Sequence, residues 1–221
     1  MILYHGSKSG IRGEISPFCG RMTCDFGQGF YMGDRPDQPK GLIAGWKDNQ
    51  FYELECDFTG LKILSFTDDY VGRMDWALYI GYNRGQIDPN QYPVLVDRYQ
   101  GYNASYDVVA GLIANDKMYR VLDDFFHLNI CDKAFLEALS RVKLGRQYVA
   151  KTKRACGQEH IKVLSVHSLS EREVKAAKVQ EINRGMQNDG IVEQLKAKYR
   201  RAIDLKFFDE LAKEWVKKAV S

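Results

Sequence analysis

Short stretches of the chain alternate hydrophobic and polar residues with a period of two. The clearest is residues 51–56, and this alternation is typical of a strand with one buried face. Further short stretches rich in apolar, aromatic or β-branched residues also predict strands, at 2–5, 30–32, 61–66, 106–111, 147–152 and 161–166. We therefore expect a sheet built from segments spread over most of the chain.

Apolar residues three and four positions apart predict helices between these strands. The segments with this spacing are 38–46, 69–82, 117–128 and 131–142. Residues 83–105 contain the turn signals Gly85, Pro89 and Pro93, so we predict mostly loop there. Because strands and helices are intermixed, we expect an α+β fold.

The pattern changes after Ser170. Glu173 follows Ser170 by three residues, which is a capping box and predicts the start of a helix. We expect helices over 171–184 and 189–219, separated at Asn188, Asp189 and Gly190. One apolar face of the second helix would comprise Ile191, Leu195, Tyr199, Ala202, Leu205, Phe208, Leu211 and Trp215. We divide the chain into a domain at 1–170 and a helical C-terminal extension at 171–221.

Composition is that of a globular protein, with 45% hydrophobic and 28% charged residues among 221. No apolar run approaches the roughly 20 residues that span a bilayer, and the amino terminus lacks a signal-peptide pattern. We therefore expect a cytoplasmic protein that does not bind membranes. The net charge of +3 lies in the extension, which has twelve Lys/Arg and nine Asp/Glu. This excess is too small to indicate a nucleic-acid partner.

The cysteines predict buried, reduced thiols. They are Cys19, Cys24, Cys56, Cys131 and Cys156. They are odd in number, none forms a CxxC pair, and the pair formed by Cys19 and Cys24 has no second ligand pair nearby. We expect neither a disulfide framework nor a metal site.

Candidate chemistry gathers at Asp25-Phe26-Gly27-Gln28-Gly29-Phe30-Tyr31 and at Tyr4-His5-Gly6-Ser7. Glycines let a ligand or a strand approach closely, and a tyrosine beside them is suited to stack on a flat ring. Taken alone, the histidine and the tyrosine would each be expected in a core. Their occurrence in two adjacent motifs favours a ligand role.

These motifs resemble the first two signatures of the ADP-ribosyltransferase superfamily, in the class of poly(ADP-ribose) polymerases and diphtheria-type toxins. The chain is still more similar to an uncharacterised bacterial family with YHGS, DFGxGFY and a late Q-Y-x-x-x-T strand, which here is residues 147–152. The resemblance covers roughly residues 1–166. It implies a split pair of small, mostly antiparallel sheets around an NAD cleft, with flanking helices.

The resemblance also implies roles for individual residues. His5 would hydrogen-bond the adenosine-side ribose of NAD and the nicotinamide amide region, Gly6 would present its backbone to the carboxamide, and Ser7 would help to fix it. Tyr31 would stack on the nicotinamide ring, beside Gly29 and Phe30 in the NAD-binding set. NAD would be the substrate, and no metal is implied. The catalytic set implied is His5, Tyr31 and Gln147.

Gln147 departs from the class, which has glutamate at this position to bond the ribose 2′-hydroxyl and stabilise the oxocarbenium-like transition state. A glutamine can hold a hydroxyl, but it carries no charge and cannot act as a base. We therefore expect a single transfer rather than polymer synthesis. Alternatively, Gln147 is an ordinary polar residue at a strand edge. The carboxylates that could assist are Asp107, Asp116 and Glu159, although aspartates of this kind often cap turns.

Other motifs are excluded by their context. Asp25-Phe26-Gly27 also occurs as the magnesium-binding tripeptide of protein kinases, but only 24 residues precede it. Gly27 and Gly29 make no dinucleotide fingerprint, since Gly33 is one residue late and no helix follows. The remaining histidines show no partner pattern and are expected to be structural. They are His127, His160 and His167.

The resulting hypothesis is an NAD-dependent mono-ADP-ribosyltransferase acting on a protein or nucleic acid. The resemblance suggests a bacterial toxin of a toxin–antitoxin or phage-defence system. Two alternatives are a degenerate module that binds NAD or ADP-ribose without turnover, and an NAD glycohydrolase. The extension would pack as a helical hairpin, dock an antitoxin, immunity protein or oligomer mate, or contact nucleic acid through Lys196, Lys198, Arg200 and Arg201.

Overall fold

A computed structural model describes residues 1–113, 116–141, 145–200 and 204–220. The described strands form one seven-stranded sheet, ordered β4-β5-β6-β2-β1-β3-β7. Only the neighbours β4 and β5 run parallel. The strands are β1 (Ile2–Ser7), β2 (Phe30–Gly33), β3 (Gln50–Cys56), β4 (Ile63–Ser65), β5 (Val108–Leu112), β6 (Arg146–Ala150) and β7 (Ile161–His167). The fold is mixed α/β, which is compatible with the predicted α+β class.

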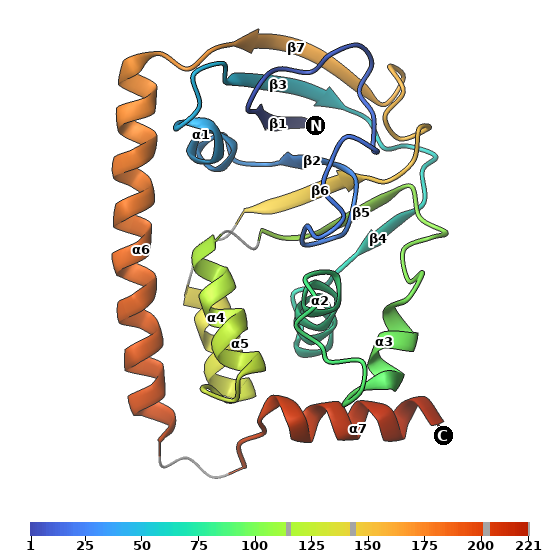
Figure 1. Cartoon of the computed structure of the whole chain (residues 1–221), viewed down its shortest axis with the longest axis vertical. Helices are drawn as coiled ribbons and strands as arrows, with labels where there is room; N and C mark the ends of the chain where they lie inside the picture. The colour runs from blue at the N-terminus through green and yellow to red at the C-terminus, as the bar shows by residue number, and fades with distance from the viewer. Residues whose placement is uncertain (114–115, 142–144, 201–203, 221) are drawn as a thin grey trace.

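The sheet is continuous but nearly divided between β1 and β2. The register gives one pair there, Tyr4 with Gly33, whereas β1 pairs with β3 over its whole length. Figure 1 shows β7, β3 and β1 above this junction and β2, β6, β5 and β4 below it. The expectation of two separate small sheets is therefore wrong in form, because this short contact joins the two halves. The sheet is nearly divided at this point because β1 and β2 form no further pair beyond Tyr4.

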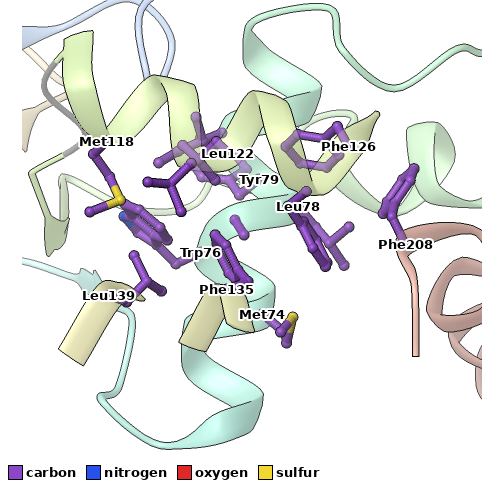
Figure 2. Close-up of a cluster of buried hydrophobic side chains, with 14 of the residues drawn as sticks. Met74, Trp76, Leu78, Tyr79, Met118, Leu122, Phe126, Phe135, Leu139 and Phe208 are labelled. Carbon is purple, nitrogen blue, oxygen red and sulfur yellow. The ribbon is translucent and has the colours of Figure 1, made fainter. Parts of the chain in front are cut away.

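Helices cover the sheet half that contains β5 and β6. They are α2 (Tyr70–Asn83), α4 (Asp116–Phe126) and α5 (Asp132–Arg141), and Figure 2 shows their apolar side chains packed together. Trp76, Phe125 and Phe135 are almost completely buried there. Val149 of β6 and Phe26 belong to the same cluster. This core fixes β6 and the segment that precedes β2.

A second core lies on the opposite face of the sheet. Leu3, Phe30, Met32, Tyr52 and Leu54 belong to it. These positions alternate along β1, β2 and β3, as the period of two requires. The loop after β1 closes over this core through two partly buried side chains, Ile11 and Ile15. The two faces of the sheet therefore carry separate apolar clusters.

The extension forms one long helix and one shorter helix, α6 (Glu171–Tyr199) and α7 (Phe208–Val220). The capping box of Ser170 and Glu173 is confirmed. The predicted break at 188–190 is wrong, because α6 runs through it and the chain turns after Tyr199 instead (Figure 1). A mid-helix glycine costs only about 1 kcal/mol, and the burial of Val192 and Leu195 against the domain outweighs it.

The extension shares the main core of the domain. Val192, Leu195, Phe208 and Leu211 are buried in the same cluster as α2, α4 and α5. The single apolar face predicted over 189–219 is thus divided between α6 and α7. Both helices nevertheless contribute to the interior. The extension is built into the domain rather than attached to its surface.

Two shorter helices complete the fold. The first, α1 (Asp37–Ile43), packs on β1 and α6. The second, α3 (Pro93–Tyr99), lies where loop was predicted and packs on α7. Pro93 occupies the first turn of α3, a position that proline tolerates, and Leu95 and Tyr99 are buried. Among the described helices, none has the length and apolarity needed to cross a membrane.

Candidate functional site

The two sequence motifs meet where β1 and β2 diverge. His5 Nδ1 lies 2.7 Å from the carbonyl oxygen of Tyr31. A carbonyl can only accept a hydrogen bond, so Nδ1 carries a proton. The bond replaces a ladder hydrogen bond that the separated strands do not form. The imidazole of His5 therefore bridges the two halves of the sheet at the point where their strands separate.

The environment of His5 keeps its ring neutral. Burial lowers its pKa below the ordinary value of 6.5, and the bond to the Tyr31 carbonyl opposes this effect only in part. The centroid of the His5 ring lies 4.4 Å from the centroid of the Phe30 ring and 5.9 Å from that of the Tyr52 ring. With Nδ1 protonated, Nε2 is a hydrogen-bond acceptor, and no described residue bonds to it.

The side chains of Tyr31 and His5 extend from opposite faces of the sheet. Tyr31 packs against the core formed by α2, α4 and α5, whereas the contacts of His5 belong to the second core. The Tyr31 hydroxyl donates to the Gly27 carbonyl (2.7 Å) and accepts from the Phe26 amide (2.9 Å). Burial, followed by the nearby Asp25, raises its pKa well above 10.0. In this conformation Tyr31 ties the glycine loop to β2, and stacking on a ligand stays a prediction.

Gly27 and Gly29 of the second motif are each favoured as glycine for a different physical reason. Gly27 has a φ of +71°, which favours glycine. A Cβ on Gly29 would lie 2.4 Å from Val149 Cγ1 and 2.9 Å from the Ala150 carbonyl oxygen. Gly29 thus lets the loop approach β6. The second motif, where we predict a ligand site, therefore also has a packing role.

The first motif is similarly constrained. A Cβ on Gly6 would lie 2.6 Å from the Pro39 carbonyl oxygen, so glycine lets α1 pack on β1. Ser7 is half-buried at the end of β1 and pairs with Gln50 of β3. Beyond Tyr4, the described strand pairing of β1 is with β3 alone, which leaves the β2-facing side of Gly6 and Ser7 without a paired strand.

Gln147 lies on the same face as Tyr31. It pairs with Gly33 of β2 and Gly111 of β5, and Tyr31 pairs with Val149 two residues further along β6. The Gln147 side chain is 6% exposed. Its Nε2 lies 3.3 Å from Asp25 Oδ2 and 3.2 Å from the Leu112 carbonyl oxygen. The structure thus brings the third motif beside the start of the second.

Asp25 begins the second motif, but the sequence indicated no role for its side chain. It is 7% exposed and forms an ion pair with Arg84, whose Nε lies 2.7 Å from Oδ1. Asn83, at the end of α2, donates to the Asp25 backbone carbonyl at 3.1 Å. A buried carboxylate is uncommon without such partners. Nothing in the local sequence signals that α2 supplies them.

Lys151 was also missed by sequence reasoning. Its ammonium donates to the Phe26 carbonyl at 2.6 Å, and burial lowers its pKa to about 8. It lies against the glycine loop, since a Cβ on Gly27 would be 3.4 Å from its Nζ. This cation stabilises the turn that precedes β2.

The other candidate carboxylates lie elsewhere. Asp107 accepts from the Lys62 amide (3.0 Å) and from the Thr152 hydroxyl (2.8 Å), which is a turn-capping arrangement. Glu159 is exposed beside His160. Asp116 begins α4, and its side chain lies outside the described residues, as does Arg201.

The remaining histidines have local contacts. His127 bonds to the Asp123 carbonyl, and His160 bonds to the Asp57 carbonyl. His167 lies 3.5 Å from Glu173. These contacts are compatible with the structural role predicted for all three residues.

The architecture is thus a mixed α/β domain whose sheet opens at His5 and Tyr31. A family described as "Protein of unknown function (DUF3990)" matches residues 1–163, and the chain belongs to that family. The match ends within β7, so α6 and α7 lie outside it. No curated protein matches the chain, and no solved structure does.

Proposed function

We propose that the protein transfers ADP-ribose from NAD to a macromolecule and releases nicotinamide. The observation that carries the proposal is the bond between His5 and the Tyr31 carbonyl at the opening of the sheet. It joins the two motifs on which the resemblance rests, and it gives His5 a defined tautomer. The Nε2 atom is then an acceptor for a ribose hydroxyl.

The residues at the opening offer hydrogen-bond partners for two groups of NAD, the carboxamide and the ribose hydroxyls. The side of β1 that faces the opening at Gly6 and Ser7 lacks a strand partner among the described residues, and strand backbone suits a carboxamide. Gln147 can accept a hydrogen bond from a ribose hydroxyl.

The proposed reaction is a substitution at the anomeric carbon of the nicotinamide ribose. The bond from that carbon to the pyridinium nitrogen breaks, and its electron pair leaves with neutral nicotinamide. A nucleophilic atom of the acceptor forms the new bond and loses its proton. Gln147 would hold the nicotinamide ribose so that this carbon is presented to the acceptor. His5, whose side chain lies on the other face of the sheet, would accept from the adenosine-side ribose at the opening.

A second candidate is binding of NAD or ADP-ribose without turnover. The observation that favours it is the environment of Gln147, which is buried and whose amide nitrogen is engaged by Asp25 and Leu112. An uncharged side chain stabilises a developing cation less than a carboxylate does. Hydrolysis of NAD to ADP-ribose is a third outcome, which needs only water as acceptor.

The experiment uses NAD labelled in its adenylate part, incubated with purified protein in the presence and absence of bacterial lysate. His5→Ala and Gln147→Ala are compared with His127→Ala, whose side chain is 65% exposed and remote from the motifs in sequence. Transfer predicts label on lysate protein or nucleic acid, retained in His127→Ala and lost in the other two variants.

The other outcomes separate the alternatives. Nicotinamide release without lysate would indicate hydrolysis. Saturable NAD binding with neither release nor transfer would support the binding module. Absence of NAD binding in the wild-type protein would contradict all three functions.

The biological setting is a further part of the proposal. A toxin that modifies a macromolecule should arrest bacterial growth when it is expressed, and His5→Ala should relieve the arrest. An antitoxin or immunity protein would bind α6, where Val179 and Ile182 are 50% and 61% exposed. Co-expression of the adjacent gene product should then suppress the arrest, and Val179→Lys should abolish that suppression.

A further inference from the structure

The amide of Gln147 has its orientation fixed by two pure acceptors. Its Nε2 faces the carboxylate of Asp25 at 3.3 Å and the carbonyl of Leu112 at 3.2 Å. Neither an ionised carboxylate nor a carbonyl can donate a hydrogen bond. Rotation of the amide by half a turn would place Oε1 against both oxygens. The orientation therefore follows from hydrogen-bond chemistry.

Asp25 is itself held in place from α2. Arg84 binds its Oδ1, and Asn83 donates to its backbone carbonyl. The guanidinium of Arg84 favours the ionised form of the Asp25 carboxylate and offsets the opposing effect of burial. The Asp25 carboxylate therefore places a fixed negative charge beside the Gln147 amide.

The surroundings of the Gln147 amide oxygen come from its neighbours on β2 and β5. Gln147 is flanked by two glycines, and the space beside Gly111 is filled by Phe26 and Trp76. Beside Gly33, the nearest atom to a Cβ would be Gln38 Oε1 at 3.3 Å. Gln147 Oε1 accepts no hydrogen bond from a described residue, and it is not among their fully buried atoms without a partner. Although the residue is only 6% exposed, Oε1 thus keeps some exposure and an unused acceptor position for a ligand hydroxyl.

We infer that Asp25 is a positioning residue that makes Gln147 present its oxygen, and not its nitrogen, to the ribose. The inference rests on the proposed function for the identity of the ligand. A hydroxyl that meets Oε1 donates the hydrogen bond it would donate to a carboxylate. The charge of Asp25 also polarises the amide, which increases the negative charge on Oε1. Gln147 and Asp25 together thus replace a single glutamate.

The decisive variants exchange the two functional groups. Asp25→Asn removes the fixed charge and introduces an amide that can either donate or accept. Gln147→Glu alone places a carboxylate against Asp25 and Leu112, which is repulsive. The double variant Asp25→Asn/Gln147→Glu restores one carboxylate and one amide with their positions exchanged. If Asp25 acts through Gln147, the double variant should be more active than either single variant.

The kinetic readout is kcat and KM for NAD in the transfer reaction. Asp25→Asn should lower kcat by about tenfold or more, the effect of weakening one transition-state hydrogen bond, with KM changed less. The double variant should recover most of that loss. A purely structural role for Asp25 predicts instead that the double variant is no better than Asp25→Asn, and this result would overturn the inference.

A second readout does not depend on activity. The side-chain amide signals of Gln147 in a ¹H–¹⁵N spectrum, assigned by their absence in Gln147→Ala, report on its two N–H groups. We expect slow hydrogen exchange in the wild-type protein and faster exchange with shifted signals in Asp25→Asn. Unchanged signals in a folded Asp25→Asn protein would overturn the inference.

The two readouts separate the possible failures. If the wild-type protein turns over no NAD but the amide signals respond to Asp25→Asn, the proposed reaction fails and the coupling of the two side chains holds. If NAD is turned over and the amide signals do not respond, the reaction holds and the role of Asp25 fails. If Asp25→Asn does not fold, the double variant tests the same coupling, because it retains a carboxylate and an amide.

Discussion

The imidazole of His5 and the backbone carbonyl of Tyr31 bond across the point where β1 and β2 separate, at 2.7 Å. The side chain of one strand thus satisfies the backbone of the next, and it does so with a neutral ring. The consequence is a stability that depends on pH in a defined direction.

Protonation of His5 is disfavoured in the folded protein, because burial lowers its pKa below 6.5. The unfolded chain therefore binds more protons than the folded one below about pH 6.5. The contribution of His5 to the free energy of unfolding is then complete above pH 6.5 and is lost as the pH falls towards the folded-state pKa. Urea unfolding at pH 7.5, 6.5 and 5.5 measures this slope, and His5→Asn should flatten it. An equal slope in both proteins would contradict the assignment.

Gly29 should tolerate no side chain. A Cβ would lie 2.4 Å from Val149 Cγ1, so Gly29→Ala should lower the free energy of unfolding by about 1–3 kcal/mol. Gly41→Ala is the matched control, because a Cβ there would meet nothing within 4 Å apart from its chain neighbours and the backbone of its own helix, α1. That control should be neutral or stabilising by up to about 1 kcal/mol. Urea denaturation of the three proteins tests the difference, and equal stabilities would show that the loop can move away from β6.

Gly190 lies within α6, where we had predicted a break. It has no neighbour within 4 Å of a Cβ and is exposed, so Gly190→Ala should stabilise the protein by about 0.5–1 kcal/mol. Thermal unfolding followed by circular dichroism measures the effect. A destabilised variant would mean that the chain bends at this position in solution.

Glu137 connects α5 to α6. It accepts from Lys198 and from the Tyr199 hydroxyl, and these bonds lower its pKa from 4.5 to about 2. Glu137→Gln should reduce the free energy of unfolding by about 1 kcal/mol at pH 7. Since a depressed carboxyl pKa stabilises only above the unfolded value, the difference between variant and wild type should shrink between pH 4.5 and pH 2. A difference independent of pH would exclude the charge as its cause.

The cysteines should differ in reactivity. Cys19 is exposed and Cys24 partly exposed, whereas Cys56, Cys131 and Cys156 are buried. Burial raises the pKa of both Cys56 and Cys156 to about 12, so their thiolates are scarce at neutral pH. Mass spectrometry after brief iodoacetamide treatment should find Cys19 modified first and the buried three only after unfolding. Early labelling of Cys56 would indicate that β3 opens readily.

Local pattern determined most of the elements. Alternation over 51–56 predicted β3, the apolar spacing over 69–82 predicted α2, and Ser170 with Glu173 predicted the start of α6. These predictions succeeded because the period of each element and the chemistry of its cap are properties of neighbouring residues. The motifs around His5 and Tyr31 were recognisable for the same reason, since each is a continuous run of the chain.

How these elements and motifs meet depends on packing and pairing between distant parts of the chain. Packing against the domain carried α6 through Gly190, and the burial of Leu95 and Tyr99 made a helix where Pro93 had suggested a loop. The register placed His5 and Tyr31 on opposite faces of one sheet. The contact of Asp25 with Gln147 spans 122 residues, and no local pattern encodes it. Continuous runs of the chain therefore indicate which residues carry candidate chemistry, whereas long-range pairing sets their partners, tautomers and orientations.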